Sequence, residues 1–328
     1  MPTGVMPLSH FQAAIEATYG TILPATRKQP ILPGAFLKEH GERHYVEEER
    51  GTYEKHYRSY VIKSHVELTG MQVAATFEDL PWFLQAFAKG GVTGGAGDAG
   101  SPKMYTYSFV PTLTSNDLKS KNWEVADDTA NFSVAGCVGQ SLELGFGTDG
   151  PMTMSVGYVG QRAVPQAVTG ALSDRVTEDI NAALFKAYID TATIGSTLHA
   201  YPLSLKFTLD NGYSPLFVGD GNLYPKEFVR GARRALKIET MLAFDSIAEY
   251  NTFKAGTERK IRLRVEGSTI HTTVKKTLDI DWYGPWAEAS FGEQGGLKTV
   301  TLSADSQYNA AAGRSWSMTI QNALATLP

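Results

Sequence analysis

Residues 277–283, with the sequence TLDIDWY, alternate between polar and apolar side chains, and this pattern decides the fold class. Successive side chains of a β-strand point to opposite faces of a sheet, so the alternation predicts a strand with one buried face. Leu278, Ile280 and Trp282 would form that face. Thr277 and the polar positions between them would point away from the core.

The same alternation recurs in both halves of the chain. It is found at 105–109, 142–146, 152–158, 203–209, 236–244, 261–265 and 316–320. Such segments are typical of antiparallel sheets with one face in the core. The sequence therefore predicts a mainly β protein.

Helical spacing is confined to short segments. Leu80, Phe83, Leu84 and Phe87 would share one face of a helix that ends before Gly90. Another segment, Ser173 to Ile189, has the same spacing and is expected to connect the two halves. Its apolar residues at this spacing are Val176, Ile180, Ala183, Leu184 and Ala187.

The second half has a helical segment of its own, from Asp245 to Lys254. Ser246 and Glu249 fit a capping box at its start, and Gly256 supplies the stop. Each half thus has a strand, a short helix and then further strands. This shared order predicts a duplication, although coincidence of pattern is the alternative.

The expected organisation is two tandem β-sandwich or barrel domains, each with a flanking α-helix. The predicted boundaries are 1–165 for the first domain, 166–195 for a helical linker and 196–328 for the second domain. A chain of 328 residues is long enough for two domains that each bury a core.

Composition limits the function. The net charge of −4 argues against a dedicated nucleic-acid binder, because such proteins use Lys and Arg to neutralise phosphates. No apolar run approaches the roughly 18 residues that span a bilayer, and residues 1–10 do not resemble a secretory signal. We expect no membrane association and synthesis in the cytoplasm. The single cysteine, Cys137, is expected to be buried.

Two segments look like surface loops. The stretch 38–58 is rich in charge, and 90–101 is rich in glycine. GAGDAG at 95–100 and GFGTDG at 145–150 match the glycine spacing of a dinucleotide-binding loop, but neither lies between a strand and a helix. The first is therefore interpreted as a flexible loop and the second as a β-turn.

No catalytic, cofactor-binding or metal-binding set is predicted, and the protein is not expected to be an enzyme. His40 and His44 have a helical spacing, but Gly41 between them disfavours a helix. The other histidines are scattered. Arg262 and Arg264 would line the solvated face of a strand, or else contact an acidic partner such as residues 47–49 of a stacked copy.

Several segments together resemble the tail tube proteins (major tail proteins) of long, non-contractile bacteriophage tails, in a double-domain form. The resemblance is carried by the order of the segments 15–21, 77–84, 105–111, 134–144 and 152–161. It implies a β-sandwich with a flanking helix, whose copies join their sheets into a ring and stack into a tube around a lumen. The chain is about twice as long as a single-domain member, which is interpreted as a second tube domain.

The resemblance also implies partners and a location. The chain would assemble with itself and contact tape measure, tail terminator and tail-tip proteins in the virion, after assembly in the host cytoplasm. DNA would be ejected through the lumen without specific binding. The alternative function is a β-sandwich binding module, such as a virion decoration or carbohydrate-binding protein, with Trp282, Tyr283 and Trp286 as an exposed platform.

Three further expectations concern assembly. The lumen should be acidic or neutral, because Lys and Arg would bind the phosphates of passing DNA. The segment 38–58 should be mobile in the free subunit and ordered in the tube. The ring should contain three chains, since two tube domains in each chain would supply the six that the family's tubes present.

Overall fold

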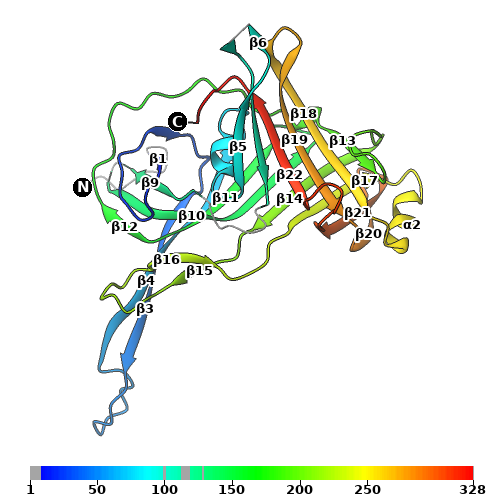
Figure 1. Cartoon of the computed structure of the whole chain (residues 1–328). Helices are drawn as coiled ribbons and strands as arrows, with labels where there is room; N and C mark the ends of the chain where they lie inside the picture. The colour runs from blue at the N-terminus through cyan, green and yellow to red at the C-terminus, as the bar shows by residue number, and fades with distance from the viewer. Residues whose placement is uncertain (1–8, 99–100, 112–118, 128, 328) are drawn as a thin grey trace.

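A computed structural model describes residues 9–98, 101–111, 119–127 and 129–327, and it is mainly β (Figure 1). Strands form a twelve-stranded sheet, a six-stranded sheet and two small hairpins. In the large sheet are β1 (His10–Ile15), β2 (Arg27–Gln29), β3 (Phe36–Val46), β4 (Arg58–Ala74), β9 (Lys121–Ala126), β10 (Asn131–Gly147), β11 (Thr153–Gly160), β12 (Arg162–Pro165), β14 (Pro202–Asp210), β17 (Leu236–Ala243), β20 (Glu288–Gln294) and β21 (Leu297–Asp305).

The second sheet lies over the first and consists of strands from both halves of the chain. Its members are β5 (Lys89–Gly94), β8 (Tyr105–Val110), β13 (Lys186–Asp190), β18 (Arg259–His271), β19 (Val274–Gly284) and β22 (Trp316–Asn322). The small hairpins pair β6 (Gly97–Asp98) with β7 (Ser101–Pro102), and β15 (Tyr213–Leu216) with β16 (Glu227–Arg230). The alternating segments noted in the sequence are all strands, as predicted.

Eight strands of the large sheet form one continuous antiparallel layer, in the order β3-β4-β11-β10-β14-β17-β21-β20. The remaining strands diverge from it along the long strand β10. The N-terminal part of β10 pairs with β9 and β12, and its C-terminal part pairs with β11 and β14. The layer therefore has two outer edges, β3 and β20, at opposite ends of the molecule (Figure 1).

The layer contains the same arrangement of four strands twice. Along the group β3-β4-β11-β10, the strands are the first, second, fourth and third in chain order. Along the group β14-β17-β21-β20 the order is again first, second, fourth and third. A helix follows the second strand of each group: α1 (Leu80–Leu84) follows β4, and α2 (Ala248–Ala255) follows β17.

Side chains on one face of the layer build the core with the six-stranded sheet. Alternation places Leu142 and Leu144 of β10 and Phe207 of β14 on this face, all nearly or fully buried. From the six-stranded sheet, Leu263 and Ile280 join the same cluster. Cys137 is buried in it as well, as predicted.

The two halves of the chain share both sheets. Strand β10 pairs with β14 across the middle of the layer, and β8 pairs with β22 in the smaller sheet. One cluster of buried apolar residues contains members of both halves. The sequence predicts a separate core for each half, whereas the structure has one core shared by both. The reason is that strands of the two halves pair with each other across the expected boundary.

The predicted linker helix is wrong. Residues 166–181, which we call the strap, contain no helix or strand beyond an isolated bridge between Asp179 and Thr76. Ala182–Leu184 form a single turn of 3-10 helix, and β13 follows. Tertiary contacts override the helical spacing here: the backbone N–H of Ile180 donates to Ala75, that of Phe77 donates to Glu178, and Met152 donates to Ile180. Of the predicted apolar face, Val176 and Leu184 are exposed.

The carboxylate of Glu178 also connects the strap to the second half of the chain. It accepts hydrogen bonds from the Ser268 backbone and pairs with Lys276 at 2.9 Å. Lys276 pairs in turn with Glu78, in the turn between β4 and α1, so that the strap, the first half and the second half meet at one cation.

Both short helices lie where the sequence predicts them, with differences at their ends. The first ends at Leu84, and Gly90 belongs to the strand β5. The second ends at Gly256 in the left-handed conformation (φ 62°), as predicted. Its capping box is not formed, since Ile247 is the N-cap and Glu249 instead pairs with Arg259.

The two predicted loops are largely hairpins. Residues 38–46 and 58 onward are in β3 and β4, leaving 47–57 as the irregular tip, and 89–94 form the edge strand β5. Backbone pairing with β4 and β8 supplies the order that these polar and glycine-rich residues lack on their own. Residues 99–100 of the GAGDAG motif lie outside the described residues. Residues 145–147 of the GFGTDG motif end β10, and residues 148–150 begin the turn to β11 that the sequence predicts.

Candidate assembly surfaces

Residues that could carry enzymatic chemistry do not form a catalytic set within the described residues. Lys121 is a buried cation whose pKa is held well below its ordinary value by burial and by the nearby Arg27. Its ammonium donates to the carbonyl oxygen of Trp82 and lies over that indole ring. Because Lys121 is fully buried, a substrate could not reach it.

The aromatic platform of a binding module is not present. Trp282, Tyr283 and Trp286 are all at most 4% exposed. The indole of Trp282 stacks on that of Trp286 and donates to the backbone oxygen of Leu236. Trp282 and Trp286 belong to the core cluster, as the parity of Trp282 with Leu278 indicates, and Tyr283 is buried as well.

The predicted cationic face of β18 is an ion-pair ladder within the chain. Arg262 lies opposite Asp281 on β19, and Arg264 lies opposite Asp279. Each guanidinium bonds both oxygens of its partner, at 2.6–2.8 Å. The bond to Asp279 raises the pKa of Arg264 above its ordinary range. The arginines are thus already paired, and a stacked copy is not needed to neutralise them.

One free edge of the eight-stranded layer is β20, beside the exposed helix α2. An edge strand presents unpaired backbone groups and is a template for pairing with another chain unless something covers it. Phe291 on this strand is 57% exposed, and Ile247 before the helix is 56% exposed. The ring of Phe291 packs edge-on against Phe244 and at a tilt against Tyr250. Exposed apolar groups along an uncovered edge are characteristic of a protein interface.

The opposite edge is β3, and the distal part of β3 and β4 projects from the body (Figure 1). We call residues 42–63 the arm. Tyr45, Tyr53 and Tyr60 are all at least half-exposed along it. Glu48 pairs with Arg50 and Arg58 on the arm itself. The arm therefore presents a mixed aromatic and charged surface at a distance from the core.

The second face of the layer points away from the core and is mildly acidic. Small polar side chains occupy much of it, among them Thr153, Ser155 and Thr301. The charged groups that alternation places on this face from β10 to β20 are two lysines, Lys206 and Lys237, and five acids, Glu143, Asp210, Glu239, Glu288 and Asp305. This part of the outer face therefore carries more acidic than basic side chains.

Two of the scattered histidines are neighbours in the structure, although no pattern in the sequence predicts it. His40 lies opposite His65 in the β3–β4 pairing, and Glu67 is beside them. His44, the partner that spacing suggested for His40, packs instead against Tyr60. The missing signal was strand register, because residues 25 apart become neighbours only when the hairpin forms.

In the described part of the chain, no helix is long and apolar enough to cross a membrane. None of the curated proteins compared with this sequence matches it. A family described as phage tail tube protein matches residues 8–310, nearly the whole chain. This match agrees with the extended antiparallel layer, its two open edges and its polar outer face. The chain therefore belongs to the phage tail tube protein family, whose members are structural components of the phage tail and not enzymes.

Proposed function

We propose that this protein forms the tube of a long phage tail as stacked rings of three chains, through which DNA is ejected into the host. The observation that carries this proposal is the repeated four-strand order in the layer. Two tandem tube domains in one chain explain it. Three chains then supply six such groups, and a closed ring leaves no strand edge of the layer unpaired.

The joint between β10 and β14 inside the chain is a template for the joint between chains. It connects the third strand of one group to the first strand of the next, antiparallel. The same step from the second group leads from β20 to β3 of a neighbouring chain. Because the eight strands alternate in direction, β20 and the neighbour's β3 would also be antiparallel. The interface is then head-to-tail and closes by rotation, as cyclic symmetry requires.

Equivalent positions in the two groups give the register of this joint. Val73 pairs with Met154 in the first group as Leu242 pairs with Val300 in the second, all four being buried. Met154 and Val300 are thus equivalent, and so are the residues that follow them, Ser155 and Thr301. Ser155 pairs with Glu143 and Thr301 pairs with Ser290, so Glu143 is equivalent to Ser290. In the first two strands of each group, β4 has one extra residue in a bulge between Leu68 and Met71. When this residue is counted, Lys38, opposite Glu67, is equivalent to Thr208, opposite Lys237, and both lie on the outer face.

Within the chain Glu143 lies opposite Thr208, so Ser290 should lie opposite Lys38 of the neighbouring chain. Cysteines at directly opposed positions have Cβ atoms about 4.5–5.5 Å apart, close enough to bridge with a small adjustment. We expect assembled tubes of the Ser290→Cys, Lys38→Cys double variant to form interchain disulfides on oxidation. On a denaturing gel without reductant, the products should be dimers and closed trimers, with nothing larger.

The matched control places the second cysteine at Glu39, which is exposed on the opposite face of β3 and should not cross-link. A ladder that continues to six chains would contradict the three-chain ring. Absence of cross-links in intact tubes would contradict the β20–β3 joint. Image averaging of the tube gives an independent measure, since true six-fold symmetry would also refute the duplication.

The outer face of the layer is proposed to line the lumen, where its acidic excess keeps DNA from binding. Replacing Glu143 and Glu239 with lysine should leave the fold intact, because both side chains lie on the face opposite the core. We expect tubes of this variant to retain short DNA at low salt and to release it as salt increases. Wild-type tubes should retain none. The same lysines failing to bind DNA would indicate that this face is not the lumen.

The proposed partners beyond the chain itself are the tape measure, tail terminator and tail-tip proteins, and the proposed location is the virion tail after assembly in the host cytoplasm. The family supports a place in the tail, and the open top and bottom of a stacked tube require proteins that end it. The rival function, a decoration or glycan-binding module, lacks its aromatic platform because those rings are buried.

A further inference from the structure

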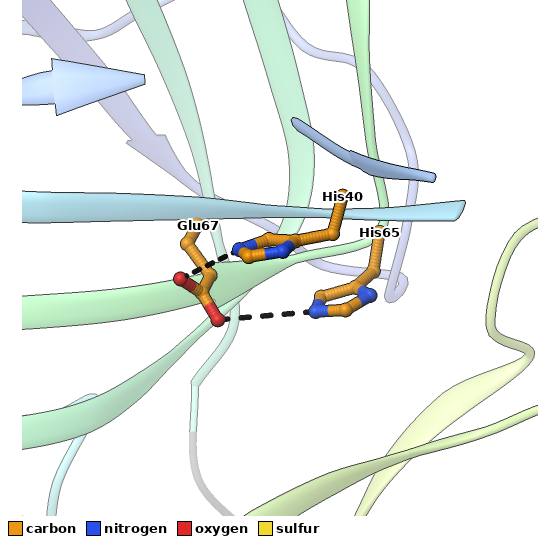
Figure 2. A group of neighbouring side chains, drawn as sticks. All are labelled: His40, His65 and Glu67. Atoms are coloured by element: carbon orange, nitrogen blue, oxygen red, sulfur yellow. Dashed lines mark ion pairs between the residues drawn. The ribbon is translucent and has the colours of Figure 1, made fainter. Parts of the chain in front are cut away.

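A cluster of His40, His65 and Glu67 lies where the arm leaves the body (Figure 2). His40 on β3 and His65 on β4 are direct cross-strand neighbours, and Glu67 is two residues beyond His65 on the same face. The His40 Nε2 atom is 2.9 Å from one carboxylate oxygen of Glu67, and the His65 Nε2 atom is 3.9 Å from the other. Both imidazoles therefore direct a nitrogen at one carboxylate.

The surroundings hold these three side chains in place. The rings stack with centroids 4.8 Å apart and planes within 8°. A pocket on this face is lined by His40 and His65 together with Pro215, in β15, and Phe217, directly after β15. The Nε2 atom of His40 is buried yet lacks a hydrogen bond of good geometry, despite its short distance to Glu67. A buried polar atom in this position requires a partner.

A cation satisfies this arrangement better than a proton does. Protonating both rings would place two positive charges in a stacked pair beside a single carboxylate. Neutral imidazole is the form that binds a metal ion.

The ligand set also selects the class of cation. Two imidazole nitrogens and one carboxylate oxygen match zinc sites that keep one position open for water. Calcium and magnesium prefer sites made entirely of oxygen. The three potential ligand atoms already lie within 4.8 Å of one another, and a bound ion would place each at about 2.0–2.2 Å from itself. The parallel rings must tilt toward Glu67 to do so, which their partial exposure permits.

We propose that His40, His65 and Glu67 form a binding site for Zn²⁺ or a similar first-row transition-metal ion. Two ligands come from β4 and one from β3, so a bound ion cross-links the strands at the base of the arm. It thereby fixes the direction in which the arm leaves the body. The site is complete within one chain and does not depend on how the copies assemble.

The test is calorimetric titration of the full-length, tag-free, metal-stripped protein with Zn²⁺. We expect one ion for each chain. The variants His65→Gln and Glu67→Gln should each bind at least about a hundred-fold more weakly, since even outer-shell changes cost ten- to a hundred-fold. The matched control is His44→Gln, which alters an exposed histidine of the same hairpin outside the cluster and should bind normally.

Thermal unfolding with a chelator present provides the folding control, and all variants should match the wild type there because the three side chains are partly exposed. With Zn²⁺ added, only the wild type and His44→Gln should unfold at a higher temperature. The proposal is overturned if the wild type fails to bind, if His65→Gln and Glu67→Gln both bind as tightly as the wild type, or if His44→Gln loses binding equally.

Discussion

Proline in β20 should abolish tube formation while leaving the subunit folded. Successive backbone N–H groups of a strand point to opposite sides, so of the two variants Ser290→Pro and Phe291→Pro, one removes an N–H that faces away from β21. That variant keeps the β20–β21 pairing and loses a donor from the free edge. We expect it to remain a monomer under conditions where the wild type forms tubes.

Light scattering and negative-stain microscopy measure this effect, and thermal unfolding identifies the proline variant that retains the native transition. Ser290→Ala is the matched control, because it changes the same side chain and keeps the backbone donor. It should assemble normally. Tubes formed by both proline variants would show that β20 is not the edge that joins neighbouring chains.

The alternation of apolar residues depends on a local property, the two-residue period of a half-buried sheet. It predicted eight of the strands, namely β8, β10, β11, β14, β17, β18, β19 and β22. It predicted β19 through Leu278 and Ile280. Strand β20, with the sequence EASFGEQ, was missed because it lacks apolar alternation. It lies at the edge of the layer, where both of its faces are largely exposed. The sequence features that make β20 hard to predict are those that make it a candidate interface.

The linker shows where local pattern fails. Val176, Ile180 and Leu184 have the spacing of a helical face, but only Ile180 is buried. The backbone of this strap bonds to residues distant in sequence, such as Ala75, and these bonds outweigh a modest helical preference. No single-sequence pattern contains that information.

The assembly surfaces could be predicted only in part. The net charge anticipated the sign of the outer face, but which acids share it follows from strand register, as with Glu143 and Glu239. Register likewise joins His40 to His65. The ring proposal rests on the order of strands in the layer. This order depends on pairing between distant segments and cannot be predicted from local sequence patterns.

Removing the arm should stop rings from stacking without unfolding the subunit. A two-stranded hairpin without a packed face is marginally stable in water, so the arm is expected to be mobile in the free subunit and ordered by contact with the next ring. Its exposed tyrosines and charges suit such a contact. The sequence-based boundaries 38–58 would cut into the pairing of Lys38 with Glu67, which belongs to the layer.

The structure gives a better deletion. Glu42 lies opposite Lys63, so residues 43–62 can be replaced by Asn-Gly, which closes a two-residue hairpin turn. This variant retains His40, His65 and Glu67, and also the backbone bond from Ser64 to Leu223. It should therefore keep both the proposed metal site and the cooperative thermal transition of the full-length chain.

Microscopy separates this defect from that of the β20 proline. The arm deletion should yield single rings in place of tubes, because the β20–β3 joint is intact, whereas the proline variant should yield no rings. We expect this large effect because the deletion removes every contact that the arm makes with the next ring. Tubes of normal length would refute a stacking role for the arm, and loss of the cooperative transition would place the arm in the folding unit.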